Sequence, residues 1–356
     1  MAAGSTTREP SHPRPCPSNH RPSHADRLAA VWLAFIAVKA AVYYETGPPT
    51  VFRYEDVPDP TVGPGDVLVQ VEAISIEGGD TLNRAGGEMA TRPHIVGYQC
   101  AGTIREVGAE VRDRSVGQRV VGTMLWGSHA ERAVFPSILT WVVPDGLDIK
   151  AAACVPIAFA TADDCLFEFG RLQRGETVLV QAGASGVGLA AIQLAKRAGA
   201  TVLATASSDE RLARLGEFGL DHGINYRTTD FADRARELTD GRCADLVVDS
   251  VGSTLSGSIR ALAYRGRCTL VGQAGRDQQP FDASSLMNGN QTLVGVFLGA
   301  EVTTDRVQQM VARHLDDVAA GTLRVVVDRT FPLAEAAAAH AYVESRQAVG
   351  RVVLIP

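Results

Sequence analysis

The sequence lacks the cysteine spacing that structural zinc or a disulfide framework requires. Its cysteines are scattered over 356 residues, and no two of them form a C-x-x-C pair. Dispersed thiols of this kind are typical of proteins in a reducing compartment, so we expect a cytoplasmic location. The six are Cys16, Cys100, Cys154, Cys165, Cys243 and Cys268.

Long apolar runs and an excess of positive charge are also missing. The apolar run at 28–38 is shorter than the ~20 residues that span a bilayer. Basic residues precede it, as in a signal peptide, but no convincing cleavage site follows it. The net charge of −6 gives no reason to expect nucleic acid or an anionic membrane as a partner.

The first residues have almost no large apolar side chains. Residues 1–27 are rich in Pro, Ser, Arg and His, and such a segment cannot bury enough surface to offset its ordering entropy. We therefore predict a disordered or non-native extension over 1–37. The run at 28–38 then forms either a frayed helix or upstream sequence read in frame, with the functional chain starting near Val38.

One stretch combines a strand, a glycine-rich turn, a helix and a second strand. Apolar runs at 177–180 and 201–206 flank the turn, which predicts a βαβ unit that binds a dinucleotide. Small residues let a pyrophosphate approach the backbone, and N–H groups at the helix start face it. The alternative is a tightly packed turn without a ligand. The predicted contacts are Gly183, Ala184, Ser185, Gly186, Val187 and Gly188.

The second strand of this unit lacks an acidic residue at its end. NAD-binding units place an acid there, where it bonds the ribose 2′-hydroxyl. Here Ala206 is followed by Ser207, with Arg211 just beyond and Tyr226 at the end of the next strand. Hydroxyls and a guanidinium suit a 2′-phosphate, which favours NADPH over NADH. The alternative for Arg211 is a solvated charge at a helix start.

The remaining pattern divides the chain into two kinds of structure. Between residues 40 and 135, short strands broken by Gly and Pro suggest a barrel-like β domain. The period then becomes helical at 151–172. Beyond it, strands alternate with helices, which predicts a doubly wound parallel sheet and an α/β fold class. A helix near 303–320 and two further strands follow.

These motifs together resemble a known family. The chain from Lys39 to Pro356 is similar to the medium-chain dehydrogenase/reductase superfamily, and within it to the zinc-independent, zeta-crystallin-like quinone oxidoreductases. The matching stretches include Gly63-Pro64-Gly65-Asp66-Val67, Gly117-Gln118-Arg119-Val120, Ala182 to Gly188, Ile224-Asn225-Tyr226-Arg227, Asp249-Ser250-Val251-Gly252 and Gly350-Arg351-Val352-Val353-Leu354.

The resemblance implies a two-domain architecture and commonly a homodimer. It implies a chaperonin-10-like β domain over 38–160, completed by 299–356, and a Rossmann domain over 161–298. Nicotinamide and a small-molecule substrate would bind between these domains. Further residues implied to line the cofactor are Thr161, Ser250, Val251, Gln273, Phe297 and Leu298.

The resemblance also locates the positions that hold catalytic zinc in other branches of the superfamily. They correspond here to Glu77, the Gly97-Tyr98-Gln99 turn and Ile157. One carboxylate, a phenol and an alkyl group do not make a tetrahedral N/S zinc site, so we predict no metal. Without a Lewis acid, the hydride acceptor must already be activated, as a quinone or an α,β-unsaturated carbonyl is.

The substrate end departs from the family pattern, and this leaves the proton donor open. The family's usual Asn corresponds to Glu77, and a frequent Tyr corresponds to Leu82. Glu77 is one candidate acid if burial raises its pKa, and otherwise it pairs with Arg84 or faces solvent. Tyr98 is a second candidate, with packing as its alternative. For His129 we expect packing, and for Trp126 a place in the substrate pocket wall.

Two other functions remain open. An enoyl thioester reductase is the first, although such enzymes often use the Tyr that is absent at Leu82. A dinucleotide-binding protein without turnover is the second, and the changes at Glu77 and Leu82 favour it.

Overall fold

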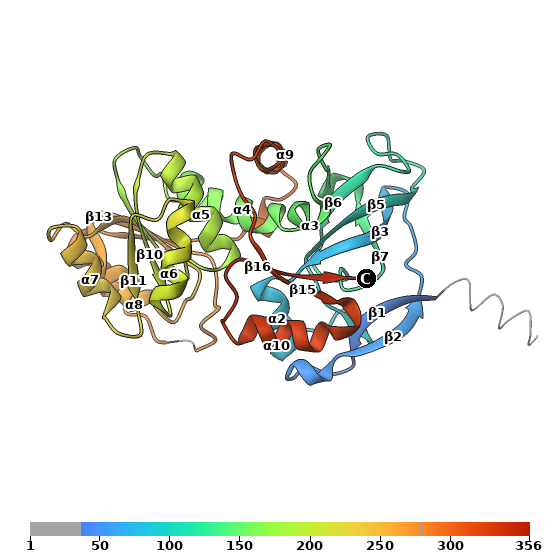
Figure 1. Cartoon of the computed structure of the whole chain (residues 1–356), viewed down its shortest axis with the longest axis horizontal. Coiled ribbons are helices and arrows are strands. Elements are labelled where there is room, and N and C mark those ends of the chain that lie inside the picture. The colour runs from blue at the N-terminus through green and yellow to red at the C-terminus, as the bar shows by residue number, and fades with distance from the viewer. Residues whose placement is uncertain (1–36, 278) are drawn as a thin grey trace, which may run out of the picture. The chain divides into compact units, whose positions relative to one another are not determined.

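Two large β-sheets of different strand direction organise the chain from Val38 onward. The computed structural model describes residues 37–277 and 279–356, and the predictions made for 1–36 lie outside them (Figure 1). Among the described residues, one sheet is entirely parallel with the order β11-β10-β9-β12-β13-β14. The other is mostly antiparallel with the order β15-β16-β3-β5-β6-β8, and β7 pairs with β3.

The parallel sheet is built around the predicted βαβ unit. Strand β9 (Thr177–Val180) is fully buried and pairs in parallel with β10 (Thr201–Ala206) on one side and β12 (Ala244–Asp249) on the other. Helix α5 (Gly186–Arg197) connects β9 to β10, and its buried face consists of small and aliphatic residues. A strand buried on both sides needs a near-continuous apolar run, which is what the sequence provides here.

The mostly antiparallel sheet joins two distant parts of the chain. Strand β3 (Asp66–Ser75) pairs with β5 (Gln99–Val107) and also with the C-terminal β16 (Arg351–Ile355). Figure 1 shows the red C-terminal strand β16 beside the blue β3. A smaller sheet of order β2-β1-β4 is formed by residues before 96. The return of β16 to β3 brings Arg351 next to the start of α2 (Gly78–Gly86).

The remaining elements lie between and around these sheets. The other strands are β1 (Ala37–Tyr43), β2 (Arg53–Pro58), β4 (His94–Ile95), β6 (Arg119–Thr123), β7 (Arg132–Pro136), β8 (Thr140–Val142), β11 (His222–Asn225), β13 (Leu262–Leu270), β14 (Thr292–Gly295) and β15 (Val327–Pro332). The other helices are α3 (Ile149–Ala152), α4 (Val155–Asp163), α6 (Asp209–Leu215), α7 (Phe231–Leu238), α8 (Leu255–Arg260), α9 (Asp305–Ala319) and α10 (Ala336–Glu344).

The structure confirms the α/β fold class, with some differences from the sequence pattern. Within the region 151–172, where a helical period was predicted, α4 passes into a π-helical turn at Asp164–Glu168. Strand β14 and helix α10 were not foreseen. No helix in the described residues combines the length and the apolar character needed to cross a membrane.

Candidate dinucleotide and substrate site

The glycine-rich turn has the close packing that its residue types predict. A Cβ on Gly183 would lie 2.7 Å from the Cβ of Ala204, and one on Gly188 would lie 2.4 Å from the Ala182 carbonyl oxygen. Both positions therefore require glycine. Ser185 is the N-cap of α5, and its hydroxyl accepts a hydrogen bond from the Gly188 N–H at 3.0 Å. The Gly186 and Val187 N–H groups have no intrahelical acceptor and face outward from the helix start.

A buried arginine brings positive charge to this turn. A Cβ on Gly186 would lie 2.5 Å from Nη1 of Arg351, so the guanidinium fills the space that the missing side chain leaves. The Gly350 N–H donates to the Ala184 carbonyl at 2.8 Å and fixes the two segments together. The helix dipole and the free amides thus meet at one place, beside a guanidinium that is itself paired with Glu77, and the amides suit a bound diphosphate.

The end of β10 carries the residues predicted to recognise a 2′-phosphate. Nη1 of Arg211 donates to the Ser207 hydroxyl at 2.9 Å, and the guanidinium also donates to the carbonyls of Arg346 and Ala348. Burial lowers the pKa of Arg211, and the nearby Tyr226 hydroxyl partly opposes this effect. Arg211 is therefore not a solvated surface charge. Sequence reasoning missed the loop of Arg346, which has a left-handed φ of 56°.

The other residues predicted to line the cofactor differ in their hydrogen bonds and in how deeply they are buried. The Val251 N–H donates to the Asp249 carboxylate at 2.9 Å, and the Val251 carbonyl accepts from Gly275 at 2.8 Å. A Cβ on Gly272 would lie 2.7 Å from the Ser250 carbonyl oxygen. The segment that leads to Gln273 therefore lies beside this loop. Phe297 is 71% exposed, whereas Leu298 belongs to the main apolar core. Helix α4 also belongs to this core, and it carries the buried Thr161.

Glu77 is buried in an ion pair. It is the N-cap residue of α2 and only 4% exposed, and its Oε1 contacts the Arg351 guanidinium. The same oxygen accepts from the Ser75 hydroxyl at 3.3 Å. The alternatives of pairing with Arg84 or facing solvent are wrong, because Arg84 pairs with Glu344. Burial lowers the pKa of Arg351 to about 10, so Arg351 remains charged at neutral pH.

The three positions that correspond to zinc ligands elsewhere in the superfamily do come together. The Gln99 amide donates to Oε1 of Glu77, and Oε1 of Gln99 accepts from the Ile157 N–H at 3.1 Å. Hydrogen bonds centred on Gln99 therefore join these segments. A carboxylate already paired with Arg351 and a neutral amide do not fit Zn²⁺, which takes Cys, His and carboxylate ligands. Among the described residues, no three His, Cys, Asp or Glu side chains form a metal-binding group.

The Tyr98 hydroxyl is held by a hydrogen bond, whereas the Glu77 carboxylate is held by an ion pair. Its hydroxyl accepts a hydrogen bond from Nδ2 of Asn83 at 2.8 Å, which leaves the phenol hydrogen available for another acceptor. Burial, and secondarily the neighbouring Asp80, raises the pKa of Tyr98, so the phenol keeps its proton at neutral pH. A Cβ on Gly79 would lie 2.3 Å from the ring, so the ring packs directly on α2.

His129 is a packing residue, as expected, and it has a partner that the sequence did not indicate. It is fully buried, and its Nε2 lies 3.1 Å from Nε2 of His340 on α10. Phe52 stacks on the His129 ring with centroids 6.3 Å apart. Trp126 is 44% exposed, with its ring 6.5 Å from that of His94.

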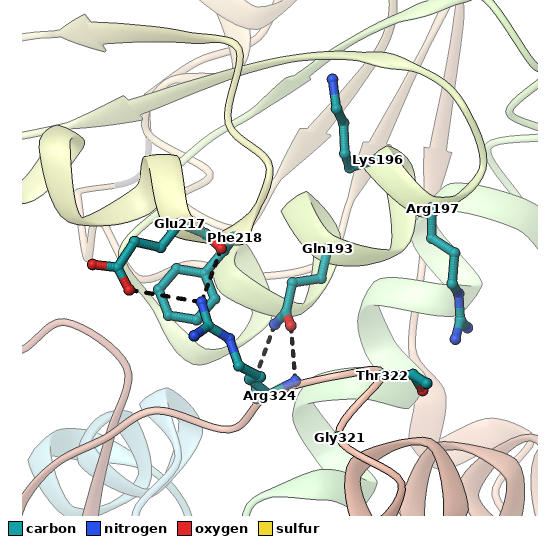
Figure 2. Close-up of a pocket in the computed structure, with 8 residues that line it drawn as sticks. All are labelled: Gln193, Lys196, Arg197, Glu217, Phe218, Gly321, Thr322 and Arg324. Carbon is teal, nitrogen blue, oxygen red and sulfur yellow. Dashed lines mark hydrogen bonds and ion pairs between the residues drawn. The ribbon is translucent and has the colours of Figure 1, made fainter.

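A surface pocket of about 270 Å³ lies at the C-terminal end of α5, away from the glycine-rich turn (Figure 2). Its charged side chains are already paired: Lys196 with Asp221 and Arg197 with Asp317. Arg324 packs over the Phe218 ring at 4.3 Å. The pocket therefore offers no unsatisfied charge to a dinucleotide.

Comparison with known proteins places the chain in a family. Residues 63–145 match the family model "Alcohol dehydrogenase GroES-like domain", and 186–316 match "Zinc-binding dehydrogenase". A 2-haloacrylate reductase from Burkholderia is 33% identical over 90% of this chain and 99% of its own. A quinone oxidoreductase from Pseudomonas aeruginosa is 33% identical over 87% and 97%.

A solved structure agrees with these relatives. A mycobacterial protein complexed with NADPH superposes with a TM-score of 0.85 at 36% identity, over 90% of this chain and all of that one. The fold and site thus define an oxidoreductase of the nicotinamide-dependent kind. The chain belongs to the medium-chain dehydrogenase/reductase superfamily, in its quinone oxidoreductase branch.

Proposed function

We propose that the protein transfers a hydride from NADPH to a quinone or an α,β-unsaturated carbonyl compound without a metal ion. The observation that carries this proposal is the convergence of cofactor groups at the carboxyl edge of the parallel sheet. The glycine-rich turn and Arg351 lie at one point of this edge, and Ser207 with Arg211 lies at the end of β10. Ligands of open α/β sheets bind at this edge.

The residues present fit NADPH in particular. The diphosphate would lie on the Gly186 and Val187 amides, beside Arg351. The 2′-phosphate would bind Arg211, the Ser207 hydroxyl and Tyr226, with Arg346 close by. When bound, NADPH supplies the hydride, and the remaining predicted contacts position the nicotinamide. Thr161, Gln273 and Phe297 are the proposed contacts at that end.

The acceptor must be electrophilic by itself, because the donor set around Glu77 and Gln99 does not suit a Lewis-acid metal. Quinones and enones meet this requirement. Two of the relatives are named for reduction of a quinone and of a 2-haloacrylate, and both compounds have an activated double bond. Positioning in a site shielded from water then provides most of the rate acceleration.

Tyr98 is the better of the two proposed proton donors. Its phenol is protonated at neutral pH and has an unused hydrogen, whereas the Glu77 carboxylate is neutralised by Arg351. Asn83 orients the phenol by donating to its oxygen. Tyr98 would donate to the oxygen of the reduced acceptor as negative charge develops there, and Glu77 would hold Arg351 in place.

The decisive experiment is NADPH oxidation by the purified protein with a panel of quinones and enones in the presence of a chelator. We expect turnover with NADPH that exceeds turnover with NADH and does not change with chelator. An inert panel, or activity that disappears with chelator, contradicts the proposal. Crotonyl-CoA beside a matched free enone tests the enoyl thioester alternative, which Leu82 makes weaker. Tight NADPH binding with no turnover would instead support a non-catalytic binding protein.

We also propose a homodimer formed through the parallel sheet. Strand β14 ends the order of this sheet in the described part of the chain, so one of its edges has no strand beside it. An exposed apolar residue, Met287 at 74%, lies in the segment that precedes β14. A second copy pairing with β14 would cover an edge that otherwise risks non-specific association. The domain boundaries at 38–160 with 299–356, and at 161–298, belong to the same proposal, as does a location in the cytosol.

A further inference from the structure

A chain of buried hydrogen bonds runs beneath the carboxyl edge of the parallel sheet, from β10 across β9 to β12. The Thr205 hydroxyl donates to Oε1 of Gln181 at 2.8 Å, and Nε2 of Gln181 donates to the Ser258 hydroxyl at 3.2 Å. The Ser258 hydroxyl donates to Oδ2 of Asp249 at 2.8 Å. All four side chains are at most 2% exposed.

The direction of every bond in this chain is fixed by the carboxylate at its end. Asp249 accepts only, so the single hydroxyl hydrogen of Ser258 must point to it, and Ser258 must accept from Gln181. The Gln181 amide nitrogen therefore faces Ser258, and its carbonyl faces Thr205. Thr205 gives its hydrogen to Gln181 and must accept at its other side, which it does from the Ala182 N–H at 3.1 Å.

Each end of this hydrogen-bond chain holds one turn of the proposed cofactor site. At one end, Ala182 has a left-handed φ of 51°, which a non-glycine residue adopts only when its surroundings enforce it. It opens the glycine-rich turn. At the other end, Oδ1 of Asp249 accepts from the Val251 and Gly252 N–H groups, both at 2.9 Å, and so shapes the turn that follows β12.

We infer that Gln181, Thr205 and Ser258 are positioning residues that set the glycine-rich turn and the turn at 250–254 in register for one dinucleotide. This inference rests on the proposed function, because the two turns have a common ligand only if the protein binds NADPH. The hydrogen bonds are buried and polarised in one direction. A break at either end therefore loosens the turn at the other end.

A double-mutant cycle on NADPH affinity tests the inference. In the described part of the chain, side-chain hydrogen bonds connect Thr205 to Ser258 through Gln181, so Thr205→Val and Ser258→Ala remove hydroxyls at separate links. We expect each variant to raise the Kd for NADPH about tenfold, and the double variant to raise it little more than either single one. Effects that multiply in the double variant would overturn the coupling.

Two further variants separate positioning from general stability. Thr269→Val removes a buried hydroxyl from β13. This strand belongs to the same sheet, but Thr269 is not part of the hydrogen-bond chain; its hydroxyl donates to the Val247 carbonyl at 3.4 Å. We expect it to leave the Kd for NADPH within about twofold while lowering stability by an amount typical of a lost hydrogen bond. Thr205→Ser keeps the hydroxyl and should bind NADPH as the wild type does. Equal loss of affinity in Thr269→Val and Thr205→Val would overturn the inference.

Hydrogen exchange in the cofactor-free protein gives an independent readout. We expect Ser258→Ala to increase amide exchange at Ala182, which follows β9 and is reached from Ser258 through Gln181 and Thr205, and Thr269→Val to leave it unchanged. Unaltered exchange at Ala182 in Ser258→Ala would contradict the coupling. A wild-type protein that binds no NADPH overturns the proposed function instead, and the exchange result then decides alone whether the two turns are coupled.

Discussion

The Glu77 carboxylate is in an ion pair with Arg351, whereas the Tyr98 hydroxyl accepts from Asn83 and has a hydrogen to donate. Substitution can therefore separate the roles of the two residues. Tyr98→Phe keeps the ring on Gly79 and removes only the hydroxyl. We expect kcat/KM for an enone to fall by ~10²–10⁴-fold, the usual effect of losing a general acid, with little change in NADPH affinity. Tyr44→Phe, which removes an exposed hydroxyl bonded to Glu55, is the control and should keep full activity. A Tyr98→Phe enzyme with normal kinetics would limit Tyr98 to packing.

Glu77→Gln is expected to affect stability rather than chemistry. The substitution leaves the Arg351 guanidinium buried without its carboxylate, and breaking a buried ion pair in this way costs about 3–5 kcal/mol. Urea unfolding should therefore show a large drop in the free energy of unfolding. The folded fraction should retain more activity than Tyr98→Phe does. The reverse order of activities would make Glu77 the acid and Tyr98 the structural residue.

Arg211 should distinguish the two nicotinamide cofactors. Arg211→Gln removes the guanidinium beside Ser207, and charge-assisted bonds to a phosphate contribute ~1.5–3 kcal/mol. We expect the Kd for NADPH to rise at least tenfold while the Kd for NADH changes little. Arg214→Gln, on the same helix but paired with Asp328 at 3.5 Å, is the matched control. An equal loss for both cofactors would mean that Arg211 only anchors the loop at Arg346 and Ala348.

At the scale of elements, the contact between α10 and the segment before β7 contains a proton-sensitive pair. Burial lowers the pKa of His129 to about 3, and it lowers the pKa of His340 well below its usual value. The folded protein therefore holds both rings neutral, whereas the unfolded chain binds protons below pH ~6.5. Stability is complete above that pH and is lost progressively as the pH falls toward 3. The loss is about 1.4 kcal/mol per pH unit for each ring.

The measurement for this prediction is the free energy of unfolding in urea at pH 7.5 and pH 5.5. We expect a smaller pH dependence in the double variant His129→Gln/His340→Gln than in the wild type. The comparison between variants is needed because burial also raises the pKa of Asp80, which acts in the opposite direction. His222→Gln on the exposed edge of β11 is the control and should behave as the wild type does. Equal pH dependence in all three proteins would contradict the prediction.

Elements with strong local patterns were predictable, and those defined by distant partners were not. The strand at Thr201–Ala206 was predicted with its observed bounds, since a short apolar run flanked by turns has few alternatives. Helix α10 has an alanine-rich sequence with no distinct apolar face, and its buried His340 pairs with a residue of the N-terminal half. Strand β14 is short and is held by pairing with β13, which no local pattern shows.

At the scale of the whole molecule, the homodimer proposed above can be tested at β14, whose outer edge has no partner strand in the described part of the chain. The Val296 N–H donates to the Leu270 carbonyl, so by the alternation of a strand the Gly295 N–H points to the open edge. Gly295→Pro removes that donor, and we expect it to weaken dimerisation at least tenfold in sedimentation experiments. A Cβ at Gly295 would meet open space, so Gly295→Ala should remain dimeric. A wild-type monomer, or a Gly295→Pro dimer of normal affinity, would contradict this interface.

The proposed site shows the same division between local and distant information. The residues of the glycine-rich turn were identified from sequence because one stretch of chain contains them all. The partner of Glu77 was not, because Arg351 is more than 270 residues away in the chain, and only the pairing of β16 with β3 brings them together. The loop of Arg346 was missed for the same reason.

The sequence by itself determined the βαβ unit and the α/β fold class. It also determined the residue types at the positions that correspond to zinc ligands elsewhere in the superfamily. These follow from short-range spacing, because side-chain period and turn chemistry act over a few residues. Only the tertiary structure decided how those residues are used. It placed Glu77 against Arg351, left Tyr98 with a hydrogen to donate, and joined two turns through Gln181. Contacts of this kind depend on which strands become neighbours, and strand pairing is a long-range outcome of packing the whole core.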